Sequence, residues 1–142
     1  MSTSRVAPGT LVVDASVSAS WLFDDEDDPY AEAVLAALEG AEAIVPQLWH
    51  YEMRNILLVA RRRQRITAPG LAERIAALTE LPLASDLDPD LDRAMQLAER
   101  HALTFYDALY LELARRRDAP LATLDAALQR AAKTEGLAFE PG

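Results

Sequence analysis

Short runs of apolar residues alternate along the chain with longer segments in which apolar and polar positions recur with a helical period. The first run, Leu11 to Val13, contains two β-branched residues and leads directly into Asp14. Short continuous apolar runs are typical of strands that are buried on both faces of a parallel sheet. The predicted strands are 10–14, 43–45, 83–84, 120–123 and a short last one at 137–139.

The segments between these runs predict helices. In 29–39, for example, apolar residues recur every three or four positions, as expected for an amphipathic helix. Asp28-Pro29 and Asp88-Pro89 are typical helix starts, in which a capping acid precedes proline. Alternating short strands and helices predict a parallel α/β sandwich. The predicted helices are 15–23, 29–39, 46–63, 67–81, 88–101, 104–117 and 125–133.

Length and composition indicate a single domain over 1–142. The chain has 142 residues, of which 51% are hydrophobic, and it contains no repeat, linker or low-complexity tract. The lack of cysteine excludes disulfides, thiolate zinc sites and a cysteine nucleophile. Neither a signal-peptide core nor a segment long enough to span a membrane is found, so we expect a cytoplasmic protein without membrane contact.

The net charge is −9, and five of the 23 acids form one run at 24–28 that we expect to be a solvated loop. An acidic total argues mildly against a general nucleic-acid coat, but it leaves room for a local basic track. Two arginine clusters, 61–63 with Arg65 and 115–117, lie at predicted helix ends. They could complement the helix dipole or contact phosphates, and the sequence favours neither.

Four acids stand at positions where a carboxylate is unusual. Asp14 and Asp125 follow predicted strands, whereas Glu52 and Asp107 lie in early helical turns among apolar residues. Neither Glu52 nor Asp107 has a Lys or Arg one helical turn away, and an unpaired carboxylate on an apolar surface loses solvation. Because parallel strands end at the same sheet edge, we expect all four acids to converge on one cleft.

Helix capping is the alternative explanation for three of these positions. Asp14 and Asp125 are each placed to cap the helix that follows, and Thr104-x-x-Asp107 resembles a capping box. Taken singly, each acid is better explained as structural than as catalytic. Glu52 is the hardest to explain in this way, because it is neither at a helix start nor clearly solvated.

Four carboxylates in one cleft would repel each other unless a cation lay between them. Ligands that are all oxygen, without His or Cys, favour Mg²⁺ or Mn²⁺ over zinc. Such an acid cluster suits attack of water on a phosphodiester. Polar neighbours that are candidates to bind metal-bound water or phosphate oxygens are Ser16, Asn55, Thr104 and Thr123.

Four segments resemble, in order, the motifs of the PIN-domain ribonucleases, and they span nearly the whole chain. The resemblance is nearest to the small single-domain toxins of the VapC type. The segments are Val13–Ser16, Pro46–Asn55, Leu103–Tyr110 and Leu121–Asp125.

This resemblance implies a three-layer α/β/α sandwich with a mainly parallel central sheet. It also implies a Mg²⁺- or Mn²⁺-dependent endoribonuclease that cleaves RNA, a cognate antitoxin that blocks the site, and a homodimer. Thr104 would supply a supporting hydroxyl and Asn55 the polar group after the second acid. The metal-binding acids that it implies are Asp14, Glu52, Asp107 and Asp125.

Other functions remain open at this stage. One is a PIN nuclease of RNA processing without a toxin role, and another is a non-catalytic α/β interaction module. A receiver-like module is disfavoured because the only lysine, Lys133, lies in a predicted helix. Trp21, Leu22 and Phe23 are expected in the core, although an exposed Trp21 and Phe23 would suit a groove for an antitoxin segment.

Overall fold

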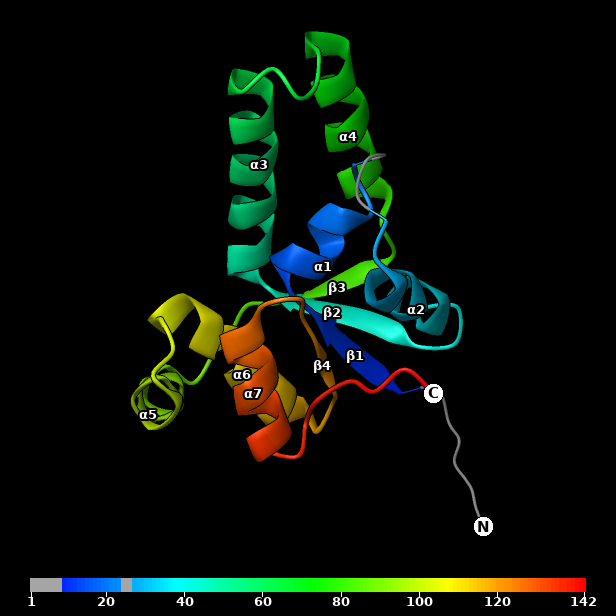
Figure 1. The fold of residues 1–142 in the computed structure, drawn as a ribbon. Helices are drawn as coiled ribbons and strands as arrows, with labels where there is room; N and C mark the ends of the chain where they lie inside the picture. The colour runs from blue at the N-terminus through cyan, green and yellow to red at the C-terminus, as the bar shows by residue number, and fades with distance from the viewer. Residues whose placement is uncertain (1–8, 24–26) are drawn as a thin grey trace.

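The fold is built on a sheet of four parallel strands (Figure 1). The structure is a computed structural model, and it describes residues 9–23 and 27–142. The three predicted loop residues 24–26 lie outside the described part. The strand order is β3-β2-β1-β4, so the first strand is central and the third lies at an edge. The strands are β1 (Thr10–Val13), β2 (Glu42–Pro46), β3 (Leu83–Asp86) and β4 (Leu121–Ala122).

Helices cover both faces of this sheet, which confirms the three-layer α/β/α arrangement. Helices α1 to α4 lie on one side and α5 to α7 on the other, and α3 and α4 project away from the sheet side by side (Figure 1). Within the described residues no helix is long and apolar enough to cross a bilayer. The helices are α1 (Ala15–Ser20), α2 (Pro29–Ala37), α3 (Gln47–Arg62), α4 (Ala68–Glu80), α5 (Leu91–His101), α6 (Phe105–Arg117) and α7 (Ala126–Thr134).

The core forms where the central strand meets the helices on either face. Leu11, Val12 and Val13 of β1 are each at most 2% exposed, which confirms that this strand is buried on both faces. On one face α3 contributes a buried row at Trp49, Met53 and Leu57, and on the other α6 contributes Leu111 and Leu113, among others. Burial of this apolar surface is the main force that holds the layers together.

Most predicted helix starts are confirmed by their capping bonds. The Asp28 carboxylate accepts from two backbone N–H groups at the start of α2, and Thr67 caps α4. The predicted start at Asp88-Pro89 is wrong by two residues, because Asp90 caps α5 through the N–H of Arg93.

Two further sequence predictions are wrong. The segment 137–139 is not a strand and makes only an isolated bridge between Leu121 and Ala138. The first helix ends at Ser20 rather than at Phe23, and the Phe23 side chain is 5% exposed, so it cannot belong to an open groove. Trp21 is half-buried, and its indole N–H donates to the carbonyl of Ala31, which anchors it against α2.

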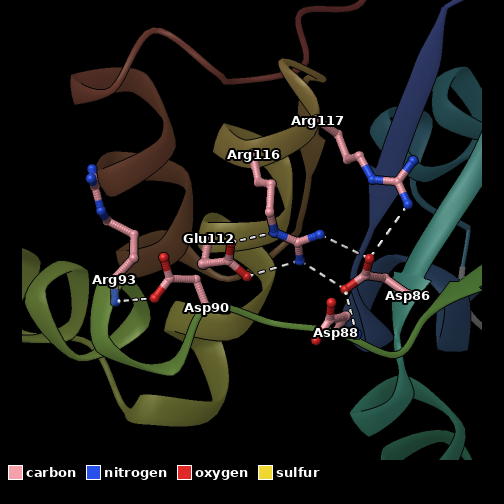
Figure 2. A network of polar contacts seen from close by, with 7 residues as sticks. All are labelled: Asp86, Asp88, Asp90, Arg93, Glu112, Arg116 and Arg117. Carbon is pink, nitrogen blue, oxygen red and sulfur yellow. Dashed lines mark hydrogen bonds and ion pairs between the residues drawn. The ribbon is translucent and has the colours of Figure 1, made fainter.

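A network of ion pairs joins the edge strand to α6 (Figure 2). The Arg116 guanidinium donates to both carboxylate oxygens of Asp86, over 2.9 and 2.7 Å, and its Nε donates to Glu112 over 2.7 Å. Asp86 and Glu112 are 7% and 1% exposed, and Arg116 holds the pKa of the Asp86 carboxyl below its usual range. Asp86 is the last residue of β3, so this network joins the end of the edge strand to α6.

Replacing Arg116 by Ala should therefore lower the free energy of unfolding by about 3 kcal/mol, because the buried carboxylates of Asp86 and Glu112 lose the guanidinium that they share. Urea denaturation at neutral pH measures this loss. Arg100→Ala is the matched control, since the Arg100 side chain is 52% exposed and Glu135 keeps Arg115 and His101 as partners. We expect the control to lose less than about 1 kcal/mol. Equal losses in the two variants would refute the importance of the network.

Candidate active site

Asp14 stands at the junction between the central strand and α1. Its carboxylate caps α1 by accepting from the backbone N–H of Val17 over 3.1 Å. The Ser16 hydroxyl donates to Oδ1 over 2.7 Å, and the Thr123 hydroxyl donates to Oδ2. The Asp14 residue is 5% exposed, so three donors compensate a carboxylate that lies almost wholly inside the protein.

Burial is nevertheless the largest influence on Asp14, and it raises the pKa of this carboxyl to about 6. The hydrogen bonds from Thr123, Ser16 and Val17 act in the opposite direction, and the charge of Asp107 adds to the rise. The last contribution links Asp14 to an acid that lies far away in the sequence.

Glu52 lies in the second turn of α3 and is half-buried. The Tyr110 hydroxyl donates to its Oε1 atom over 2.5 Å, which fixes one carboxylate oxygen. Burial raises the pKa of Glu52, the bond from Tyr110 opposes the rise, and the charge of Asp107 adds to it. The predicted early-turn position is confirmed, and the hydrogen bond that Glu52 accepts comes from a phenol.

Tyr110 is a residue of this region to which sequence reasoning gave no role. Its side chain is 1% exposed, and Glu52 is its hydrogen-bond partner from 58 residues away. The only available signal was a buried tyrosine one helical turn after Asp107, since a buried phenol needs a polar partner.

Asp107 and Asp125 belong to the first turn of α6 and the start of α7. The Thr104 hydroxyl caps α6 by accepting from the N–H of Asp107 over 3.1 Å, and Asp125 caps α7 through the N–H of Leu128 over 2.9 Å. Burial first, and then the charge of Asp125, raises the pKa of the Asp107 carboxyl. The capping explanation is thus correct for Asp14, Thr104 and Asp125.

Asp107 is the electrostatic centre of the four acids. Its charge raises the pKa of both Asp14 and Glu52, and the charge of Asp125 raises its own. However, among residues 9–23 and 27–142 no three acidic or histidine side chains lie close enough to hold a metal ion together. The acids are therefore electrostatic neighbours, and their oxygens would have to draw together around an ion.

The donor chemistry fits a hard divalent cation. The four acids offer only carboxylate oxygens, and their mutual repulsion is what a bound positive charge would relieve. A Mg²⁺ or Mn²⁺ ion at this place would be held by Asp14, Glu52, Asp107 and Asp125.

The polar neighbours take different positions. Ser16 and Thr123 bind Asp14, and they also accept from the backbone N–H groups of Leu124 and Asp125, over 2.9 and 3.0 Å. Asn55 is exposed on α3 and lines a cavity of about 210 Å³ on that helix. Both serine and threonine hydroxyls are thus engaged within the protein, whereas the Asn55 amide faces the surface.

The match to a family model decides the family. The model described as the PIN domain matches residues 11–134, a range that contains all four acids. The chain belongs to the PIN domain family. Proteins of this family are in general nucleases. No curated protein matches the chain.

Solved structures share the PIN fold of this chain over nearly its whole length. PAE2754 from Pyrobaculum aerophilum is 25% identical with a TM-score of 0.64, covering 94% of this chain and 90% of its own. VapC20 of Mycobacterium tuberculosis, described as a sarcin-ricin loop cleaving toxin, is 13% identical with a TM-score of 0.60, covering 93% and 99%. FitAcB from Neisseria gonorrhoeae is 16% identical with a TM-score of 0.65, covering 92% and 97%.

The raised pKa of Asp14 predicts an unusual pH dependence of stability when metal is removed by a chelator. The folded carboxyl keeps its proton up to about pH 6, whereas the unfolded one releases it near 3.8. Between these values the folded state binds more protons, so the free energy of unfolding should fall by about 2 kcal/mol as the pH rises from 4 to 6.

Urea denaturation across this pH range tests the prediction with Asp14→Asn, because asparagine also caps helices but does not titrate. The variant should show a flatter profile than the wild type. Glu99→Gln on the exposed side of α5 is the control and should keep the wild-type slope. Identical slopes for wild type and Asp14→Asn would contradict the assignment.

Proposed function

We propose that the chain is a metal-dependent endoribonuclease that hydrolyses RNA phosphodiesters with Mg²⁺ or Mn²⁺. The observation that carries this proposal is the coupling of Asp107 to Asp14, Glu52 and Asp125 within the matched PIN region. Helix capping accounts for Asp14 and Asp125 singly, but it does not account for the clustering of the four acids, because each acid makes charging its neighbour more costly.

The side chains around the acids orient them for this role. Ser16 and Thr123 fix the Asp14 carboxylate, and Tyr110 holds one oxygen of Glu52, so that the second Glu52 oxygen remains to face an ion. Thr104 fixes the first turn of α6 and with it the backbone of Asp107. A divalent ion bound there would supply an acidic water and a positive charge beside the leaving oxygen.

We further propose that the nuclease is the toxin of a type II toxin–antitoxin pair, with a cognate antitoxin as partner and a homodimer as its assembly. VapC20, which has the same fold, is described as a toxin, and this description supports the proposal. An antitoxin segment with a basic side chain would neutralise the four acids and exclude RNA from them. Amphipathic segments of this kind bind in apolar grooves.

The purified protein should cleave an RNA that contains a single-stranded loop when Mn²⁺ is added, and a chelator should stop the reaction. Asp107→Asn should reduce the cleavage rate about 100-fold or more, because Asp107 is the centre of the acid cluster. Gel analysis of a labelled RNA measures the rate, and Glu99→Gln should cleave like the wild type. Full activity in Asp107→Asn would refute the assignment.

A thermal melt of the same proteins separates a metal site from independent helix caps. Saturating Mn²⁺ should stabilise the wild type, by about 2.7 kcal/mol at a hundredfold excess over the dissociation constant. Asp125→Asn keeps the cap but removes one repelling charge, so its stability in chelator should be unchanged or higher and its response to Mn²⁺ weaker. A wild-type midpoint that does not move with Mn²⁺ would count against the metal site.

Expression of the intact protein should arrest bacterial growth, because uncontrolled cleavage of RNA stops protein synthesis. Co-expression of the protein encoded directly upstream should relieve the arrest and co-purify with the nuclease. The Asp107→Asn variant is the control and should be tolerated. Normal growth at high expression, together with RNA cleavage in vitro, would favour a role in RNA processing over a toxin.

A further inference from the structure

We infer that the outer face of α3 is the surface along which a single-stranded stretch of RNA lies when it enters the active site. This inference rests on the proposed ribonuclease function and adds the binding surface and the form of the substrate. The outer face of α3 consists of six exposed residues, Gln47, Tyr51, Arg54, Asn55, Leu58 and Arg62.

The helical period places these residues on one side of α3, opposite the buried row that contains Trp49, Met53 and Leu57. Glu52 flanks this face, one helical turn before Asn55. The helix extends away from the sheet beyond Glu52 (Figure 1). A strand of RNA on the outer face would therefore lead directly to the acid cluster.

The charge of this helix is opposite in sign to that of the molecule as a whole. The protein carries a net charge of −9, whereas α3 holds Arg54, Arg61 and Arg62 against a single acid, Glu52. The Arg54 guanidinium donates to the backbone carbonyl of His50 over 3.0 Å, and no carboxylate of residues 9–23 or 27–142 pairs with it. Across the described ranges of the chain, neither Arg61 nor Arg62 forms an ion pair, so these charges are available to phosphates.

The other arginine cluster, at the end of α6, is neutralised within the protein. Arg115 pairs with Glu135 over 2.6 Å, and Arg116 and Arg117 pair with Asp86 over 2.7 and 3.4 Å. These pairs give the guanidinium groups of 115–117 carboxylate partners within the protein, a role that neither explanation from the sequence included. Of the two arginine clusters, α3 rather than the end of α6 therefore offers positive charge to an RNA backbone.

Tyr51 indicates that the RNA is single-stranded at this surface. Its ring is 62% exposed, its hydroxyl accepts only a 3.3 Å bond from Gln47, and it precedes Glu52 in the chain. An exposed aromatic ring one helical turn before Arg54 is a platform on which an unpaired base stacks, whereas paired bases in a duplex do not offer their faces.

The test measures binding of a fluorescein-labelled RNA by anisotropy at several salt concentrations, with chelator present to prevent cleavage. The double variant Arg54→Gln/Arg62→Gln should bind single-stranded RNA at least tenfold more weakly at low salt. The slope of log affinity against log salt should become shallower by about 1.4, as expected for two lost phosphate contacts. Tyr51→Ala should lose about tenfold in affinity with an unchanged slope, because stacking releases no counterions.

Arg93→Gln/Lys133→Gln is the matched control, because it removes the same charge from α5 and α7. Figure 2 shows Arg93 pointing away from the ion-pair network, and Lys133 lies beside Phe139 at the far end of the sheet. The control should bind RNA like the wild type. All variants alter exposed or half-buried side chains, and thermal melts in chelator should confirm that they fold.

Wild-type cleavage of the same RNA with Mn²⁺ separates this inference from the proposed function. If the wild type cleaves RNA but both double variants bind it equally well, the inference is wrong and the proposed function stands. The α3 variants could instead bind RNA like the wild type, while the co-expressed upstream protein no longer relieves the growth arrest that they cause. In that case the face binds a protein, and the inference is overturned. A wild type that neither binds nor cleaves RNA overturns both.

Discussion

The structure depends on the way a buried charge, that of Asp14, is held at the end of the central strand. Ser16 binds it from the next helix and Thr123 from the end of β4, and the same two hydroxyls accept from the backbone of Leu124 and Asp125. This polar cluster joins two neighbouring strand ends that are 107 residues or more apart along the chain. A buried carboxylate is tolerated only when hydrogen bonds of this kind compensate its lost solvation. The same bonds join the ends of β1 and β4 and fix the position of Asp14.

Capping and site chemistry are not alternatives in this molecule. Asp14 and Asp125 each cap a helix. At the same time the charge of Asp107 raises the pKa of Asp14, and the charge of Asp125 raises the pKa of Asp107. Helices that follow parallel strands begin at the same sheet edge, where their N-termini favour negative charge. The residues best suited to start these helices therefore also bring their carboxylates to the same sheet edge. The cluster needs only Glu52 from the second turn of α3 and Asp107 from the first turn of α6 in addition.

Much of this organisation could be predicted from local sequence, and the remainder depends on contacts between distant residues. Continuous apolar runs and caps such as Asp28 and Thr67 predicted the strands and helix starts, because these signals act within a few residues. The bond from Tyr110 to Glu52 and the ion pairs from Arg116 to Asp86 join residues 58 and 30 positions apart. Sequence patterns do not encode such partners. They predicted Phe23 in the core, which is confirmed, but not the guanidinium groups of Arg65 and Arg74 that lie against its ring.

The ion pairs at the end of α6 have a consequence for how this protein meets a polyanion in solution. The protein is a body with net charge −9 whether or not its arginines are paired, but pairing with Glu135, Asp86 and Glu112 cancels the local positive potential on that side. Such a body and a nucleic acid repel one another at distances shorter than the screening length of the salt around them. If RNA binds along the outer face of α3, as inferred above, the internal ion pairs would reduce its association with the α6 side and favour an approach in which α3 comes first.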